Sequence, residues 1–204
     1  MKPNPPGAFA EYTLPAIHDP RTNTTVMDSL KIVAYLDETY PDTPALFPSP
    51  TRSLTYAFQD ALYLNVMQHL SLLLAPTLVA KLNAPGQAYL RPKLERIFGC
   101  KVEYVLTPEK RVELWAALEK GLNALASWFE GAGDGRLLLM GGGSGADGGD
   151  GLLCHADTSI AGFLAYARVG WGEESEEWQR IANLNGGRWK RFLKYFEKWV
   201  DTSH

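Results

Sequence analysis

The sequence predicts a mainly α-helical protein with a small α/β lobe at its start, and two observations lead to this fold class. Residues 12–40 contain two short strand-like runs and one amphipathic helix, whereas the chain beyond residue 50 shows helix-period apolar patterns. A proline-rich linker over residues 40–50 separates the two parts. We therefore predict two domains, at residues 1–48 and 49–204.

The small lobe is predicted to be a strand, a turn, a strand and a helix. The first strand lies in the run Tyr12-Thr-Leu-Pro-Ala-Ile-His-Asp19. Leu14-Pro15 stands where this strand begins, and Asp28-Ser29 stands where the second strand meets the helix. Both pairs can therefore lie at one end of the hairpin, and that arrangement can hold a small anionic ligand.

The helix after the hairpin has a clear start. Asp28 is a good N-cap, Ser29 opens the helix, and Tyr40-Pro41 is a stop signal. Its apolar residues recur at helical spacing: Ile32, Val33, Leu36 and Tyr40. The first turn is expected to present free backbone N–H groups and the positive end of the helix dipole, which favour a carboxylate or phosphate.

These residues resemble a known family. The order of a Leu-Pro strand, a turn, a strand, Asp-Ser and a helix ending in Tyr40-Pro-Asp-Thr-Pro-Ala-Leu-Phe-Pro48 resembles the second half of the thioredoxin-like domain of cytosolic glutathione S-transferases. The closest resemblance is to fungal members related to the β-etherase type. It covers nearly the whole chain, and it implies a truncated thioredoxin-like domain (strand, strand, helix) followed by an all-α C-terminal domain.

The resemblance also implies a glutathione site. Leu14 would pair its backbone with the cysteinyl part of glutathione, Pro15 would be the cis-proline, and Asp28 and Ser29 would hold the γ-glutamyl end. A cis bond before Pro15 would turn the backbone groups of Leu14 outward, where they can pair with an extended peptide.

The residue that activates the glutathione thiol cannot be named from the sequence. In the family this Ser, Tyr or Cys follows the first strand of a strand–helix–strand half, and the proline-rich residues 1–10 leave no room for that half. We therefore expect a chain truncated at its start. Tyr12 could donate a phenol to a thiolate, but in a strand such a residue more often serves packing.

The rest of the chain reads as helices. One long helix, either continuous or kinked at Pro76, is predicted over residues 51–81, with Asn83-Ala-Pro-Gly-Gln87 ending it. A charged helix is predicted over residues 89–98. Thr107-Pro108 starts a strong helix that ends at Gly131. Its predicted apolar stripe is Val112, Trp115, Leu118, Leu122, Leu125 and Phe129.

Residues 131–151 are dominated by glycine and are predicted to be a flexible surface insertion. A phosphate-binding loop would need a Gly-Lys-Ser/Thr ending, and the nearby charges are acidic. A calcium-binding loop would need alternating ligands and a closing Glu. Neither pattern is present in this segment.

The next helix, residues 155–168, starts with a resemblance to the family's folding motif. Asp157 matches the residue that returns a hydrogen bond to the cap, and Cys154 stands where Ser or Thr is expected. A thiol is a poorer acceptor, so we expect a weaker cap. The alternative, a metal or nucleophile site at Cys154-His155, is disfavoured because adjacent side chains diverge at a helix start.

The C-terminal run, residues 187–200, is an amphipathic basic helix, and the segment 178–184 before it has a similar pattern. Such a helix can bind calmodulin or a membrane, but the closing helix of an α-helical lobe is the favoured interpretation. Its apolar stripe is Trp189, Phe192, Phe196 and Trp199, and its basic residues are Lys190, Arg191, Lys194 and Lys198.

The composition argues against several classes of function. A formal net charge of −3 over 204 residues supplies no basic field for nucleic acid or an anionic membrane. Cys100 and Cys154 are far apart, which supports neither a disulfide framework nor a thiolate metal site, and fits a cytoplasmic location. The start lacks the apolar core of a signal peptide, and the apolar run 70–80, broken by Pro76, is too short to span a bilayer.

The leading functional hypothesis is a glutathione S-transferase that joins the glutathione thiol to small hydrophobic electrophiles. Glutathione would be the co-substrate, no metal is expected, and family members commonly form homodimers. Tyr56, Tyr63 and Met67, with His69, are candidates for an acceptor pocket between the lobes, although core packing or a dimer face explains them equally well. The alternatives are a non-catalytic glutathione-binding or protein-interaction module, and a scaffold or obligate oligomer that pairs through an open strand edge.

Overall fold

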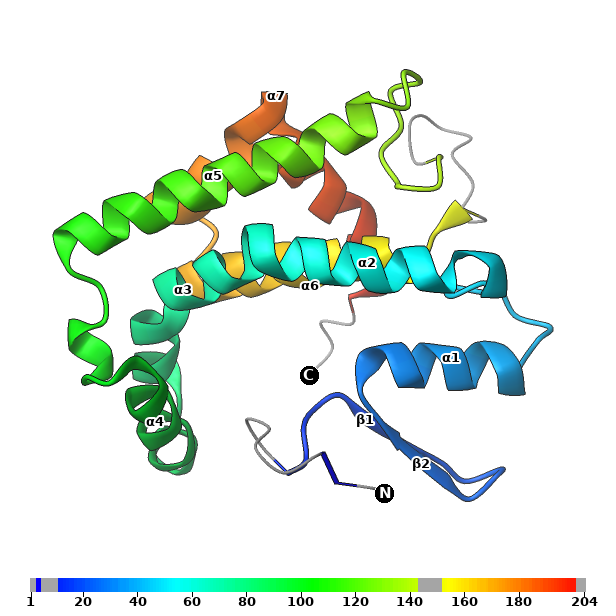
Figure 1. The fold of residues 1–204 in the computed structure, drawn as a ribbon, viewed down its shortest axis with the longest axis horizontal. Coiled ribbons are helices and arrows are strands. Elements are labelled where there is room, and N and C mark those ends of the chain that lie inside the picture. The colour runs from blue at the N-terminus through cyan, green and yellow to red at the C-terminus, as the bar shows by residue number, and fades with distance from the viewer. Residues whose placement is uncertain (1–2, 5–10, 143–151, 201–204) are drawn as a thin grey trace. The chain divides into compact units, whose positions relative to one another are not determined.

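The computed structural model describes residues 3–4, 11–142 and 152–200 (Figure 1). The chain divides into two compact units, Met1–Tyr56 (unit 1) and Ala57–His204 (unit 2).

Unit 1 consists of a hairpin and a helix in the residues that the structure describes. The strands are antiparallel, and helix α1 packs on both of them (Figure 1). The apolar side chains of Met27, Ile32, Val33 and Phe47 are buried. The elements are β1 (Ala16–Asp19), β2 (Thr24–Met27), α1 (Ser29–Thr39) and the short 3-10 turn η1 (Ser49–Thr51).

Asp19 joins the turn of the hairpin to α1. Its buried carboxylate accepts hydrogen bonds from the Tyr35 and Tyr40 hydroxyls, both at 2.6 Å, and from the Arg21 N–H at 2.9 Å. The Arg21 guanidinium also lies over the Tyr40 ring. Hydrogen bonds from Tyr35 and Tyr40 hold the pKa of Asp19 well below its usual range, because they stabilise the ionised form.

The segment predicted to be a linker is bound to α1. Asp37 accepts hydrogen bonds from the backbone N–H groups of Phe47, at 2.7 Å, and Leu46, at 3.3 Å. Glu38 forms an ion pair with Arg52 at 2.7 Å. The proline-rich segment is therefore part of unit 1.

Every regular element among the described residues of unit 2 is a helix or a helical turn. Helix α2 begins in unit 1 and continues without a break through the π-helical turn η2 into α3. The elements are α2 (Arg52–Leu62), η2 (Tyr63–Met67), α3 (Gln68–Lys81), α4 (Ala84–Phe98), η3 (Val102–Tyr104), α5 (Pro108–Glu130), α6 (His155–Trp171), α7 (Glu176–Phe196) and η5 (Glu197–Trp199).

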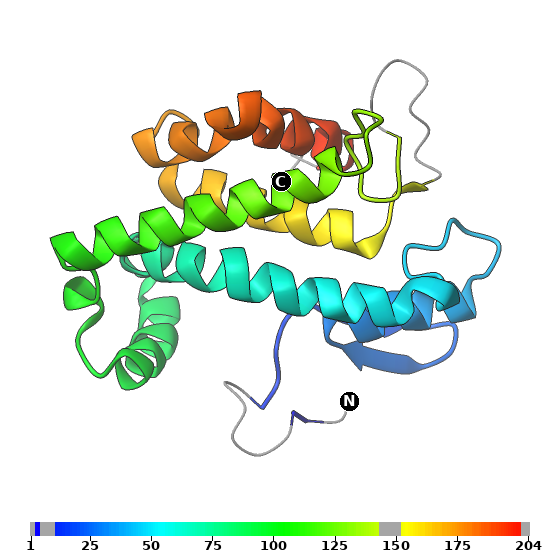
Figure 2. The same ribbon diagram turned by 45° about the horizontal axis from the view of Figure 1, so that its top comes forward.

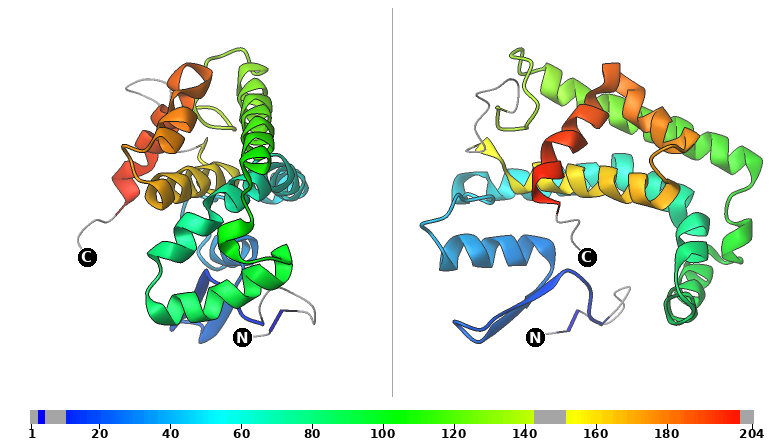
Figure 3. Two further views of the ribbon diagram at one scale, coloured as in Figure 1. Left: turned by 90° about the vertical axis from the view of Figure 1, so that its left-hand side faces the viewer. Right: turned by 180° about the vertical axis from the view of Figure 1, so that it is seen from behind.

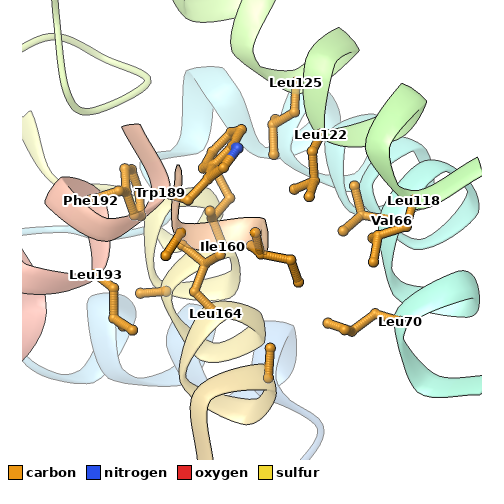
Figure 4. Packing of buried hydrophobic residues seen from close by; sticks show 14 of the residues in the cluster. Val66, Leu70, Leu118, Leu122, Leu125, Ile160, Leu164, Trp189, Phe192 and Leu193 are labelled. Atoms are coloured by element: carbon orange, nitrogen blue, oxygen red, sulfur yellow. The ribbon is translucent and has the colours of Figure 1, made fainter. Parts of the chain in front are cut away.

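Four helices enclose the core of unit 2. Helix α3 packs against α5 and α6, and α7 packs against the same two helices. In the left view of Figure 3, α6 and α7 lie on one side of α5. In Figure 4, Ile160 and Leu164 of α6 lie between residues of α7 and residues of η2 and α3. Burial of these side chains is the main favourable term for the unit.

Helix α5 and the π-helical turn η2 approach each other closely at Gly121. Figure 2 shows the long α5 running beside η2 and α3. A Cβ atom on residue 121 would lie 1.8 Å from the Asn65 carbonyl oxygen, so this crossing requires glycine. The Asn65 side chain donates to the Ala61 carbonyl oxygen at 2.7 Å inside the same helix. Apolar spacing alone predicted a continuous helix here, and the π-helical turn was not foreseen.

The start of helix α4 (Ala84–Phe98) was predicted wrongly. Asn83 does not end a helix. It is the N-cap of α4, whose side chain accepts a hydrogen bond from the Gly86 N–H at 2.9 Å, and Pro85 fits the first turn because that turn needs no N–H donor. Helix α4 therefore begins at Ala84 rather than at Tyr89, and it ends at Gly99, which has a φ of 70°.

Two residues predicted in apolar stripes are exposed. Val112 is 71% exposed, although the rest of the α5 stripe is buried. Trp199 is half-exposed because the chain leaves α7 at Phe196 for the 3-10 turn η5. Helix α7 is itself interrupted at residues 184–187, where Gly186 and Gly187 have positive φ values. This break agrees with the two separate helical segments expected from the sequence.

Residues 136–139 of the glycine-rich segment pack on other parts of unit 2, so the prediction of a flexible insertion was wrong for these residues. Leu138 is fully buried, and Leu139 donates its N–H to Asp157 at 2.8 Å. Arg188 of α7 donates to the Arg136 carbonyl oxygen at 3.2 Å. Apolar Leu137–Leu139 supply the packing that the glycines around them cannot. The rest of the predicted insertion, residues 143–151, lies outside the described residues.

The continuous helix from Ser49 to Lys81 is long and apolar enough to cross a membrane by length and composition. The expectation that this region is too short for a span considered only residues 70–80, and the helix is longer than that run. Leu70, Leu73 and Leu74 of this helix are buried in the core of unit 2, which accounts for much of its apolar character.

Replacing Gly121 by Ala is expected to lower the free energy of unfolding by about 1–3 kcal/mol or more, because α5 and η2 must move apart. Urea denaturation measures the effect. The matched control is Gly162→Ala in α6, where a Cβ meets nothing within 4 Å and where alanine is expected to add about 0.5–1 kcal/mol. Equal stability of G121A and the wild type would show that the helices do not cross this closely.

Candidate functional site

The two dipeptides singled out in the sequence meet at one end of the hairpin. Ala16 pairs with Met27 at the last position of the sheet, and the Asp28 N–H donates to the Pro15 carbonyl oxygen at 3.3 Å. The Leu14-Pro15 peptide bond is cis. The structure therefore brings Leu14, Pro15, Asp28 and Ser29 together.

Asp28 connects β2 to α1. Its carboxylate accepts hydrogen bonds from the N–H groups of Leu30, at 3.0 Å, and Lys31, at 3.4 Å. Its backbone has φ 85° and ψ 124°, a conformation that L-residues rarely adopt. The cap and the sharp change of direction thus occur at one residue.

This arrangement corrects the expectation of a helix start with free N–H groups. Asp28 itself uses two of them. The groups of Ser29 are still available to a ligand. Its side chain is exposed, and its hydroxyl has no hydrogen bond within the described parts of the chain. Ser29 therefore offers a hydroxyl and a helix N-terminal N–H to a ligand.

Leu14 is an exposed residue just before β1. Its residue surface is 89% exposed, and its backbone N–H and C=O form no hydrogen bond in residues 3–4, 11–142 and 152–200. Unpaired backbone groups at the end of a strand can bond to an extended peptide.

Together these groups match the chemistry of a peptide with a free amino-acid end. A carboxylate at Asp28 can accept from an ammonium group, and the donors of Ser29 can bind a carboxylate. The open backbone of Leu14 can bind a peptide unit. The hairpin end can therefore hold a short peptide by one α-amino-acid group and one main-chain segment.

The candidates for an acceptor pocket lie on the continuous helix from Ser49 to Lys81. Tyr56 is half-exposed and contacts the Phe47 ring edge-on at 5.7 Å. Tyr63 is also half-exposed, and Met67 is partly buried; both belong to η2. Burial lowers the pKa of His69, and the charge of Lys110 adds to this. The acceptor pocket stays a prediction.

A groove of about 460 Å³ lies on unit 2 between α5 and α7. Two ion pairs cross its rim: Arg111 with Glu177 at 2.6 Å, and Arg180 with Glu119 at 2.5 Å. The Arg180 guanidinium also covers the Trp115 ring at 4.5 Å. The charges of these four residues at the groove are therefore paired with one another.

Cys154 and Asp157 lie at the start of α6, as the folding motif implies. The Asp157 carboxylate is fully buried and accepts hydrogen bonds from the N–H groups of Cys154, at 3.1 Å, and Leu139, at 2.8 Å. The Cys154 thiol donates to the same carboxylate at 3.1 Å. The bond to Leu139 was not foreseen, because no sequence pattern links residues so far apart.

The surroundings of Cys154 disfavour a nucleophile. Burial, and then the charge of Asp157, raise the pKa of the Cys154 thiol to about 12, so it is held protonated. In the described part of the chain no group of three or more His, Cys, Asp or Glu side chains could hold a metal ion.

Comparison with known proteins gives the family. The family model described as glutathione S-transferase, C-terminal domain, matches residues 53–199. The chain belongs to the glutathione S-transferase family. The glutathione S-transferase-like protein ustS of Aspergillus flavus is 28% identical over 211 residues, which cover 98% of this chain and 72% of that protein.

Solved glutathione transferases have the same fold. GSTFuA2 from Phanerochaete chrysosporium is 36% identical with a TM-score of 0.85, covering 98% of this chain and 77% of that one. CsGST63524 of Ceriporiopsis subvermispora, solved in complex with glutathione, is 32% identical with a TM-score of 0.88, covering 100% of this chain and 78% of that one. The predicted relation to fungal-type glutathione transferases is confirmed.

The predicted fold class is confirmed as well. The glutathione transferase chain has the strand–strand–helix part of a thioredoxin-like domain, followed by an all-α C-terminal domain. The roles of Leu14, Pro15, Asp28 and Ser29 toward glutathione stay predictions.

Replacing Cys154 by Ser is expected to raise the free energy of unfolding by up to about 1 kcal/mol, because a hydroxyl is a better cap than a thiol and donates more strongly to Asp157. Chemical denaturation at pH 7 measures the change. Cys100→Ser is the control, because Cys100 is exposed and its replacement should have almost no effect. A destabilised C154S would contradict the idea of a weak cap.

Unit 1 is expected to lose stability as the pH falls below about 4, the usual pKa of Asp. Asp19 has a lowered pKa in the folded state, so its contribution is present above the unfolded pKa and is lost as the pH falls toward the folded value. Tyr40→Phe removes one of the hydrogen bonds and should flatten this dependence. Hydrogen exchange of hairpin amides between pH 2 and 6 measures it, with the exposed Tyr104→Phe as control. An unchanged profile in Y40F would contradict the role of Asp19.

Proposed function

We propose that this protein binds glutathione at the hairpin end of unit 1 and transfers its thiol to small hydrophobic electrophiles. The observation that carries the proposal is the meeting of the open Leu14 backbone with the Asp28-Ser29 helix start. Two similar glutathione S-transferases of Ceriporiopsis subvermispora, CsGST63524 and CsGST83044, were solved in complex with glutathione, which supports it.

Each group of the site has a role in this proposal. Asp28 accepts from the ammonium of the γ-glutamyl end, and Ser29 donates to its carboxylate. The backbone N–H and C=O of Leu14 pair with the cysteinyl residue and so fix the direction of the thiol. In this proposal, these residues bind glutathione and orient its thiol. Ionisation of the thiol needs a further donor, which the proposal does not place among them.

A second candidate is a non-catalytic glutathione-binding or protein-interaction module. It is favoured by the chemistry of the hairpin end, where the contributing groups bind and position a peptide. One measurement separates the enzyme from either kind of module: only the enzyme replaces the chloride of a chlorodinitrobenzene by the glutathione sulfur and so forms a thioether.

Further properties are proposed on sequence grounds and on family resemblance. We place the domain boundary between residues 48 and 49, the acceptor pocket at Tyr56, Tyr63 and Met67, and the protein in the cytoplasm. The last proposal is supported by two free cysteines that form no disulfide. A homodimer is proposed because dimerisation is typical of the family.

Calorimetric titration with glutathione tests the proposal. The wild type is expected to bind, and Ser29→Ala is expected to weaken binding about 10- to 100-fold, because a charged carboxylate loses a hydroxyl donor. Ser53→Ala is the matched control, since Ser53 is another exposed serine in the first turn of a helix. Absence of binding by a folded wild-type sample would overturn the proposed function.

A further inference from the structure

Met27 makes an unusual contact at the end of β2. Its sulfur accepts a hydrogen bond from the backbone N–H of Thr13 at 2.9 Å. Met27 is 6% exposed, so its thioether lies beneath the segment that leads into Leu14. A thioether is a weak acceptor, and it is seldom the partner of a backbone N–H.

The next residue makes the matching contact on the other side of Leu14. The Asp28 N–H donates to the Pro15 carbonyl oxygen at 3.3 Å. Met27 and Asp28 are consecutive in the chain. They therefore bond to Thr13 and to Pro15, the two neighbours of Leu14. The backbone groups of Leu14 itself are left without a bond in the described residues.

We propose that Met27 is a positioning residue for glutathione, which acts by holding Thr13 so that the Leu14 backbone faces the ligand. This inference rests on the proposed function, since it assigns Met27 a role at the same site. Sequence patterns point to Met27 only as a buried strand residue, and the contact with Thr13 appears only in the structure.

The physical reason is preorganisation. Segment 11–15 has no regular secondary structure, so few other bonds fix its backbone angles. Without the sulfur, the Thr13 N–H loses its partner, and the Leu14 backbone samples more conformations before binding. Ordering it then costs conformational entropy at the moment of binding, which lowers affinity. The contact also couples both halves of the site, because Met27 directly precedes Asp28.

The test is Met27→Leu in the full chain, which removes the acceptor and nearly conserves volume. The Kd for glutathione, measured by calorimetry, is expected to rise about twofold, the value of a hydrogen bond at the weak end of the usual range, because a thioether is a weak acceptor. Met140→Leu is the matched control, since Met140 is half-exposed and belongs to unit 2, and it should leave the Kd unchanged.

Hydrogen exchange followed by NMR separates positioning from general stability. In M27L without ligand, the Thr13 amide is expected to exchange faster, while the amides of Ile32 and Val33 in α1 keep their rates. Faster exchange of all three would show a general packing role and overturn the inference.

The two proposals fail in different ways. If the wild type binds glutathione and M27L binds equally well, the positioning role is wrong and the proposed function stands. If the folded wild type does not bind, the proposed function is wrong and the role of Met27 in binding falls with it. The Thr13 exchange rate still reports whether the sulfur holds this segment.

Discussion

The candidate site depends on Asp28, because this residue performs three tasks at once. Its N–H holds the strand that carries Pro15, its carboxylate caps α1, and its backbone makes the turn from β2 into the helix. Each of these could be done by a different residue in a longer loop. Here the hairpin and the helix meet without any intervening loop, so the ligand-binding groups on both sides have fixed relative positions.

Buried or half-buried carboxylates connect irregular segments to helices at several places in the chain. Asp19 ties the hairpin turn to α1, Asp37 binds the proline-rich segment, and Asp157 connects the start of α6 to the segment near Leu139. In each case an ionisable oxygen pair accepts two or more N–H or O–H donors, which offsets the loss of hydration. Irregular segments are thereby ordered by a few directional bonds, while apolar packing holds the helices together.

The sequence predicted elements well where local rules act. Asp28 as an N-cap and the apolar stripe of α5 follow from capping chemistry and helical period, which need no knowledge of distant contacts. The start of α4 was missed although its Asn83 cap is a local signal, and the other failures come from tertiary structure. The π-helical turn at Asn65 is coupled to a glycine on another helix, and the segment at Leu138 is ordered by partners far away in sequence.

The site shows the same division. Leu14 and Ser29 were found through family resemblance, and their meeting follows from the register of a short hairpin. The occupation of two helix N–H groups by Asp28, and the contact of Met27 with Thr13, depend on side-chain positions that no spacing rule predicts. Sequence reasoning thus selected the residues that are proposed to bind the ligand, but it could not say which of their polar groups are free.

The positive φ of Asp28 limits how this position can vary in evolution. Glycine would relieve the backbone but would remove the cap, and most other side chains would fit neither requirement. The Asp side chain supplies an oxygen that accepts from the helix N–H groups, which glycine lacks. A replacement at residue 28 therefore has to satisfy a backbone with positive φ and a helix cap together, and it would also have to keep the negative charge that an ammonium group would bind.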